Sequence, residues 1–393
     1  MIFSFAGHAL DTDRRVLTRG GQEVAIEPQV FDVLRVLVEN AGAVVSKDHL
    51  IEAVWGGRIV SEASISSRIN AARTAVGDSG KDQRVIRTVQ RRGFELVAPV
   101  ETGRHPETRE TTELRQTIRY TSSPDGTNIA WSSAGRGEGL LYCWHHLSHL
   151  EKDWSSSLLA PGLWQLASGF RLVRYDVRGS GLSDPIRDGT TMDRHVEDLL
   201  AVADAAGLER FPIVALLQNT AVAIRFAARY PARVSRLVLH NAYVRGRAIR
   251  ENATEQPEHD PFIALLDSGG WGDPENPFMR AWATMVVPGA STKDTTELIR
   301  LIANAGSPHD ALVQRDLIDR LDMTGDLANV SCPTLVIHAR LCGIHPASEG
   351  RRVAAGIPDA EFLELDSAST VFFATDPVFD RLQEATLGFL ADG

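Results

Sequence analysis

The chain has 393 residues, of which 43% are hydrophobic and 23% charged, a composition typical of globular proteins and sufficient for two domains. No apolar run is long enough to span a bilayer, and three cysteines suit a reducing environment, so we expect a cytoplasmic protein with no membrane partner. The net charge of −10 excludes a general attraction for nucleic acid, so any DNA binding must come from a local basic cluster.

The charge is distributed unevenly along the chain. Residues 1–100 contain 13 basic and 12 acidic side chains, whereas residues 101–393 contain 28 and 39. Four arginines of the first segment lie within nine residues: Arg84, Arg87, Arg91 and Arg92. The N-terminal segment is therefore the part of the chain that is suited to DNA.

Three helices are predicted in this segment. Pro28 starts the first, in which apolar residues recur at helical spacing as far as Val38, and Ser46 precedes a short second helix. Ser61 opens the third, over residues 61–77, and its apolar stripe consists of Ile65, Ile69, Ala72 and Val76. The opposite face of this third helix carries Ser64, Arg68, Asn70 and Arg73.

A hairpin follows the three helices. Two β-rich runs, around 85–89 and 94–97, are joined by Gln90-Arg91-Arg92-Gly93, which predicts a hairpin with a basic tip. Three helices followed by a basic hairpin predict an α+β winged helix over residues 1–100. A solvated charged face on a small α+β domain is the alternative interpretation.

The segments IEPQVFDVLRVLVENAGAVVSKDHLIEAVW and VIRTVQRRGFELV resemble the OmpR/PhoB-type winged-helix effector domain. The resemblance implies that helix 61–77 enters the major groove of double-stranded DNA, with the wing near the backbone or minor groove. We expect the DNA contacts to come from Ser64, Arg68, Asn70, Arg73, Arg87, Arg91 and Arg92.

Beyond a polar linker predicted at residues 101–116, the chain alternates between strands and helices. Strands are expected at 140–143, 171–175, 212–216, 236–240, 334–338 and 361–365, which predicts a parallel α/β sheet with crossover helices over residues 117–393. Helical sequence with aromatic residues, from about 243 to 327, interrupts the alternation. We expect it to form a helical cap over the carboxyl edge of the sheet, where such folds bind ligands.

Three segments of this region resemble the α/β-hydrolase fold. They are RLVRYDVRGSGLSD at 171–184, FPIVALLQNTAVAIRFAARYPARVSRLVLHNAY at 211–243 and WHHLSHLEKDW at 144–154. By the resemblance they form the turn after the fourth strand, the nucleophile elbow with its flanking elements, and the loop of the oxyanion hole. Arg178 is expected to buttress the first of these.

The three catalytic positions of that fold hold unsuitable residues. An elbow needs Gly-x-Ser-x-Gly, but its central position here is Leu217, which has no nucleophilic atom. Cys342 occupies the slot of the acid and Thr370 that of the base. We therefore predict no catalytic residues. Because a leucine at positive φ is strained, the elbow is expected to relax.

The same positions predict a pocket that binds without reacting. Its expected lining is His146, Leu147, His149, Leu217, Gln218, Trp271, Trp282, Cys342 and Thr370. The amides of Gln218 and of a residue near Leu147 are expected to remain as a donor pair. His146 or His149 is expected to donate to a ligand, the alternative being a hydrogen bond within the loop. No metal or cofactor is expected, and an aromatic cap favours an apolar or aromatic ligand.

These features predict a DNA-binding transcriptional regulator, acting as a homodimer, whose inactive hydrolase-like domain binds a small-molecule effector. Two alternatives stay open. One is an active hydrolase with a site rebuilt around Cys342 or His345, fused to the DNA-binding domain. The other is a scaffold that binds no ligand and only dimerises the protein.

Overall fold

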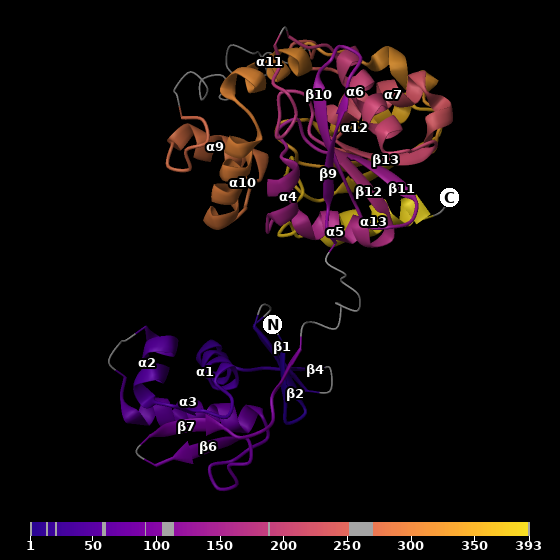
Figure 1. The fold of residues 1–393 in the computed structure, drawn as a ribbon. Helices are drawn as coiled ribbons and strands as arrows, with labels where there is room; N and C mark the ends of the chain where they lie inside the picture. Colours follow the sequence, from indigo (N-terminus) through magenta and orange to yellow (C-terminus); the bar gives the residue numbers. More distant parts are fainter. Residues whose placement is uncertain are drawn as a thin grey trace. The chain divides into compact units, whose positions relative to one another are not determined.

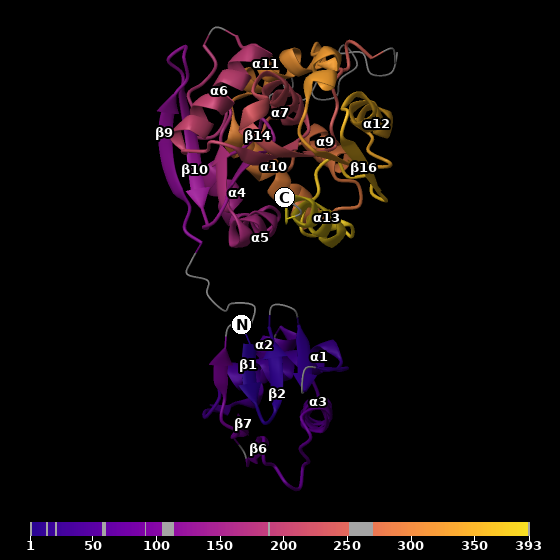
Figure 2. The same cartoon turned by 90° about the vertical axis from the view of Figure 1, so that its right-hand side faces the viewer.

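A computed structural model of the chain describes residues 2–12, 15–19, 22–56, 60–90, 92–103, 114–187, 189–250 and 270–391. The chain divides into two compact units, Met1–Thr112 and Glu113–Gly393, which are drawn in Figure 1 and, from a second direction, in Figure 2. No helix among the described residues is long and apolar enough to cross a membrane.

The first unit contains three helices, as the sequence predicts. They are α1 (Pro28–Glu39), α2 (Lys47–Trp55) and α3 (Glu62–Ala75). The hydroxyls of Ser46 and Ser61 cap α2 and α3 by accepting from the backbone amides of His49 and Ser64. The predicted stripe of α3 is buried in the core of the unit.

Two antiparallel sheets complete this unit. The wing is formed by β6 (Ile86–Val89) and β7 (Gly93–Leu96), which also pairs with β5 (Val44–Val45). The other sheet, which the sequence analysis missed, has the order β4-β3-β2-β1-β8. Its strands are β1 (Ile2–Phe5), β2 (His8–Asp11), β3 (Val16–Arg19), β4 (Gln22–Val24) and β8 (Glu101–Gly103).

The linker does not begin at residue 101, as the sequence analysis predicted. Residues 101–103 form β8, whose backbone pairs with the free edge of β1, with Ser4 opposite Glu101. The polar composition gave no sign of this pairing, because a strand this short is held by its neighbour's hydrogen bonds. Residues 104–113 of the predicted linker lie outside the described residues.

The second unit is built on an eight-stranded sheet with the order β16-β15-β14-β13-β11-β12-β10-β9. The six predicted strands are all present and pair in parallel, while β9 and β10, which were not predicted, add an antiparallel edge. Their bounds are β9 Thr117–Ser122, β10 Asn128–Ala134, β11 Gly139–Cys143, β12 Arg171–Tyr175, β13 Phe211–Leu216, β14 Val234–His240, β15 Thr334–Ala339 and β16 Ala360–Leu365.

Helices cover both faces of this sheet. In both views α5 (Ala160–Gly169) and α13 (Phe379–Ala391) lie on one side of it, and α6 (Met192–Ala205), α7 (Gln218–Arg229) and α12 (Ala347–Gly356) on the other. Between β14 and β15 the chain forms the cap helices α9 (Pro277–Val286), α10 (Thr292–Ala305) and α11 (Pro308–Asp319). Residues 251–269 of the predicted cap lie outside the described residues.

Candidate functional site

The first candidate site is the exposed side of α3 together with the wing. Ser64, Asn70, Arg87 and Arg92 are exposed, and Arg68 is partly exposed and forms an ion pair with Glu27. Arg91 lies outside the described residues. These five side chains are therefore accessible to a DNA partner.

Arg73, a predicted DNA contact, instead has a structural role. It is only 5% exposed, and its guanidinium donates to the carbonyl of Ile86 at 3.0 Å and to the hydroxyl of Thr88 at 2.9 Å. A third contact, to Asn70 Oδ1, measures 3.4 Å. The sequence pattern placed Arg73 on the polar face, but its long side chain reaches the wing strand β6 and fastens α3 to it.

Asp78 holds the loop between α3 and the wing and was missed by the sequence analysis. Its carboxylate accepts from the backbone amides of Ser79 (2.8 Å), Arg84 (3.0 Å), Val85 (3.0 Å) and Ile86 (2.9 Å). Burial by itself raises the pKa of Asp78, but the four amide donors outweigh it and hold the pKa below its ordinary value. The ionised Asp78 carboxylate thus adds to Arg73 in holding the wing against α3.

The second candidate site begins at the turn between β13 and α7. Leu217 lies there with φ 52° and ψ −125°, so the expectation that the elbow relaxes is wrong. Hydrogen bonds hold the turn: the Leu217 amide donates to the carbonyl of His240 at 3.0 Å, and the amide of Thr220 donates to the Leu217 carbonyl at 3.0 Å. These tertiary contacts offset a backbone strain of about 1–3 kcal/mol.

The slots after β15 and β16 come together near this elbow. The sulfur of Cys342 lies 3.4 Å from the hydroxyl oxygen of Thr370, and both residues are buried. The backbone amide of Thr370 donates to the carbonyl of Val286 in the cap at 2.7 Å. Thr370 and Leu217 both line one cavity, whereas Cys342 does not.

That cavity lies between the sheet edge and the cap and measures about 920 Å³ counted to its opening. This volume includes the open solvent at the mouth of the cavity. The predicted pocket residues that line it are His146, Leu147, Leu217, Gln218, Trp282 and Thr370.

Three predicted pocket residues do not line the cavity. Cys342 is the first. His149 is the N-cap residue of α4 (Leu150–Ser155), so its backbone starts that helix. The indole of Trp271 donates to the carbonyl of Gly306 at 3.1 Å, which braces the cap. In each case sequence proximity to the pocket did not decide where the side chain points.

Further polar residues line the cavity: His145, Asp153, Arg247, Arg315, Asp319 and His345. The sequence analysis named His345 only as a member of a possible rebuilt site and did not predict the other five as lining residues. The Asp319 carboxylate of α11 accepts from Arg247 at 3.2 Å and from Arg315 at 2.8 Å. Burial raises the pKa of Asp319, and Arg247 opposes this effect. No local sequence motif predicts the cluster of Asp319, Arg247 and Arg315, because the fold brings these residues together from different segments.

The imidazoles of the cavity wall are neutral at physiological pH. Burial lowers the pKa of His145 to about 3 and those of His146 and His345 well below the ordinary value. His345 stacks on Tyr243 with ring centroids 4.0 Å apart. The backbone amide of Leu147 donates to Nδ1 of His145 at 3.1 Å, so this half of the predicted donor pair is already engaged within its loop.

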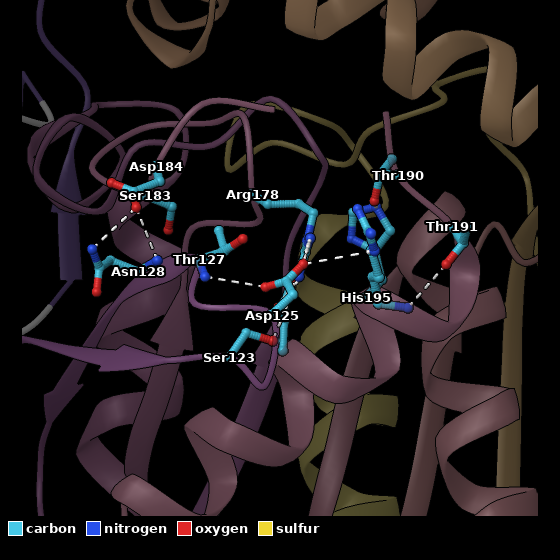
Figure 3. Close-up of polar contacts among 12 residues, drawn as sticks. Ser123, Asp125, Thr127, Asn128, Arg178, Ser183, Asp184, Thr190, Thr191 and His195 are labelled. Atoms are coloured by element: carbon cyan, nitrogen blue, oxygen red, sulfur yellow. Dashed lines mark hydrogen bonds and ion pairs between the residues drawn. The ribbon is translucent and has the colours of Figure 1, made fainter. Parts of the chain in front are cut away.

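Arg178 stabilises the turn after β12, which confirms its predicted role. Its guanidinium donates to Asp198 of α6 at 2.7 and 2.6 Å, and to Asp125 of the β9–β10 turn at 2.7 Å. Figure 3 shows Arg178 reaching toward Asp125, close to the start of α6. These bonds fix the turn after β12.

Both units are similar to known protein families. Residues 21–96 match the family described as "Transcriptional regulatory protein, C terminal", and residues 135–288 match the "alpha/beta hydrolase fold". The chain is 34% identical to the "Transcriptional activator CadC" of Escherichia coli (strain K12) over 85 residues, which is 21% of this chain and only 17% of CadC.

The second unit has both sequence and structural relatives. The chain is 25% identical over 229 residues to the "Putative carbamate hydrolase RutD" of Escherichia coli O1:K1 / APEC, covering 57% of this chain and 83% of that protein. The enol-lactonase from Burkholderia xenovorans LB400 superposes with a TM-score of 0.58 at 20% identity, covering 70% of this chain and 100% of that one. The predicted fold class, a winged-helix region followed by an α/β-hydrolase fold, is confirmed.

Proposed function

We propose that this chain, which joins a DNA-binding transcriptional regulatory domain to an alpha/beta hydrolase domain, is a transcriptional regulator controlled by a small molecule. The cavity of the second unit binds the effector and does not hydrolyse it. The observation that carries the proposal is the combination of a retained elbow with Leu217 at its tip and a cavity beside it.

Catalytic inactivity is supported by what surrounds Leu217. A hydrolytic nucleophile needs a base within hydrogen-bond reach that a third group orients. Cys342 receives the backbone amide of His345 at 3.4 Å, while the ring of His345 is engaged through Nδ1 with Arg250 at 3.2 Å. Among the described residues, His345 thus contacts the thiol through its backbone amide and not through its ring, which disfavours a rebuilt enzyme with a Cys342–His345 pair.

We infer that α4 transmits effector binding toward the linker. His146 in the loop before α4, and Asp153 within it, line the cavity. The side-chain amide of Gln116 donates to the carbonyl of Leu150, the first residue of α4, at 2.9 Å, and Leu114 packs against the core of the unit. A ligand that shifts this loop also shifts the anchor of residues 114–116, from which the chain leads to the DNA-binding unit.

The cap acts on the same helix. Glu297 of α10 accepts from the hydroxyls of Ser156 and Ser157 at 2.7 Å each, directly after α4. A movement of the cap on effector binding would therefore act on the C-terminal end of α4 through Glu297. In this proposal the regulator acts as a homodimer, with α3 of each protomer in a major groove and Arg92 of each wing on the DNA backbone.

A thermal-shift screen of the full chain tests the proposal. A compound that binds only the folded state raises the unfolding free energy by about 2.7 kcal/mol at a hundred times its Kd. A hit should change the affinity for operator DNA at fixed salt and should lose its effect in Leu217→Trp, which fills the cavity. Compounds that bind without changing DNA affinity would contradict a regulatory role.

A further inference from the structure

Two neighbouring buried side chains of the cavity, His146 (7% exposed) and Gln218 (4% exposed), have nitrogens with no well-formed hydrogen bond among the described residues. The two side chains lie close enough for Gln218 to act on the pKa of His146 as a hydrogen-bond partner, which accounts for at most one of the two ring nitrogens. Both residues line the cavity. Buried polar groups are nearly always paired, and an unpaired one destabilises the fold. Two such groups facing one cavity indicate that a bound molecule supplies their partners.

The chemistry of these groups restricts that molecule. Burial keeps the pKa of His146 well below its usual value, so the ring is neutral, with one N–H donor and one nitrogen acceptor. The Gln218 amide nitrogen only donates. With the Gln218 side chain beside the His146 ring, a molecule that satisfies both residues must carry an acceptor for the Gln218 nitrogen and a donor for the unprotonated ring nitrogen of His146.

The charged groups of the cavity disfavour an anionic headgroup beside His146. Arg247 and Arg315 both donate to Asp319, so they already serve a carboxylate on the cap side. The imidazole of His145 lies beside that of His146, with ring centroids 4.1 Å apart, and burial lowers the pKa of His145 to about 3. An anion beside two neutral imidazoles would lose its hydration without gaining a cation, which is unfavourable.

We propose that the cavity takes a ligand with an uncharged amide-type headgroup, whose carbonyl accepts from Gln218 and whose N–H donates to His146. Apolar side chains form much of the remaining wall, among them Trp282, Val286, Leu298 and Ile302. They suit an aromatic or aliphatic body on that headgroup. The inference rests on the proposed function, because it names the chemical class that the effector site selects.

A matched fragment series tests the headgroup. Phenylacetamide, phenylacetate and phenethylamine share one body and differ in charge. Binding to the full chain is followed by melting temperature and by tryptophan fluorescence, since Trp144 and Trp282 line the cavity. We expect the amide to bind at least tenfold more tightly than either charged analogue. Equal or tighter binding of the carboxylate or the amine, or no binding of the amide at millimolar concentration, would overturn the inference.

Variants connect the preference to the two residues. His146→Phe and Gln218→Leu keep much of the side-chain volume and remove the polar atoms, so each should weaken amide binding about tenfold. His149→Phe is the matched control, because His149 belongs to the same loop but does not line the cavity. The melting temperature of each unliganded variant establishes that it folds. Unchanged amide affinity in both folded cavity variants refutes the assignment.

The two proposals fail in different ways. If a charged analogue binds best and changes DNA affinity, the effector site stands and the headgroup inference is wrong. If the amide binds through His146 and Gln218 but neither it nor any screening hit changes DNA affinity, the headgroup inference stands and the regulatory function is wrong.

Discussion

Replacing Arg73 with Met removes the buried fastening between α3 and the wing while keeping an apolar stem of similar length. The two shorter bonds of the guanidinium, at 3.0 Å to Ile86 and 2.9 Å to Thr88, are lost. Thr88 is exposed, so water replaces its lost partner, whereas the Ile86 carbonyl loses a charged donor. A hydrogen bond to a charged group contributes about 1.5–3 kcal/mol. Because the variant also avoids burying a charge, we expect the free energy of unfolding of the first unit to fall by about 2 kcal/mol.

Calorimetry of the full chain measures this loss, and hydrogen exchange of the α3 amides assigns the transition to the first unit. For a unit of this size, 2 kcal/mol lowers the melting temperature by about 8–16 °C. Arg84→Met is the control, because Arg84 is exposed and its replacement should change stability by less than about 0.5 kcal/mol. An unchanged melting temperature combined with a loss of base preference would show that Arg73 reads DNA, and the structural reasoning would then be refuted.

Four further outcomes are expected. Arg92→Ala should weaken binding to all DNA sequences and reduce the salt slope by about 1 in a titration at several ionic strengths. The pKa of Asp78 is depressed in the folded state, so its stabilisation is present above the unfolded pKa of about 3.9 and is lost as the pH falls through the folded value. Asp78→Asn should therefore flatten the acid limb of the stability curve of the first unit. Leu217→Ser should not create esterase activity in a spectrophotometric assay, since a hydroxyl alone lacks its base. Gln116→Ala should leave effector affinity unchanged but reduce the effector-dependent change in DNA affinity; an unaltered response would exclude this anchor from the route.

The elements with strong periodicity could be predicted from the sequence. The stripe from Ile65 to Val76 defines α3, and the hydrophobic run before Leu217 defines β13, because burial on one or both sides leaves a clear pattern. The strands β1 to β4 have only three or four residues each, too few for a period to appear. Strand β8 forms because it pairs with β1, and such a pairing cannot be predicted from the composition of the segment.

The site was harder to predict than the fold, for two physical reasons. Local preference argues against leucine at positive φ, yet tertiary hydrogen bonds hold Leu217 there. The cavity wall is also assembled from segments far apart in the chain, so Arg247 and Asp319 meet without any shared motif. Arg73 shows the related difficulty that a long side chain on a polar face can still turn inward to a neighbouring strand.

Turnover by the unaltered protein tests the central claim most directly. The full chain is incubated with nitrophenyl esters and a panel of lactones, and product formation is compared with buffer alone and with Cys342→Ala. The account predicts no hydrolysis above background in either protein, because Leu217 offers no nucleophile at the elbow and the Nδ1 atom of His345 contacts Arg250 rather than Cys342. Hydrolysis by the unaltered protein that disappears in Cys342→Ala would contradict it and would identify a rebuilt enzyme.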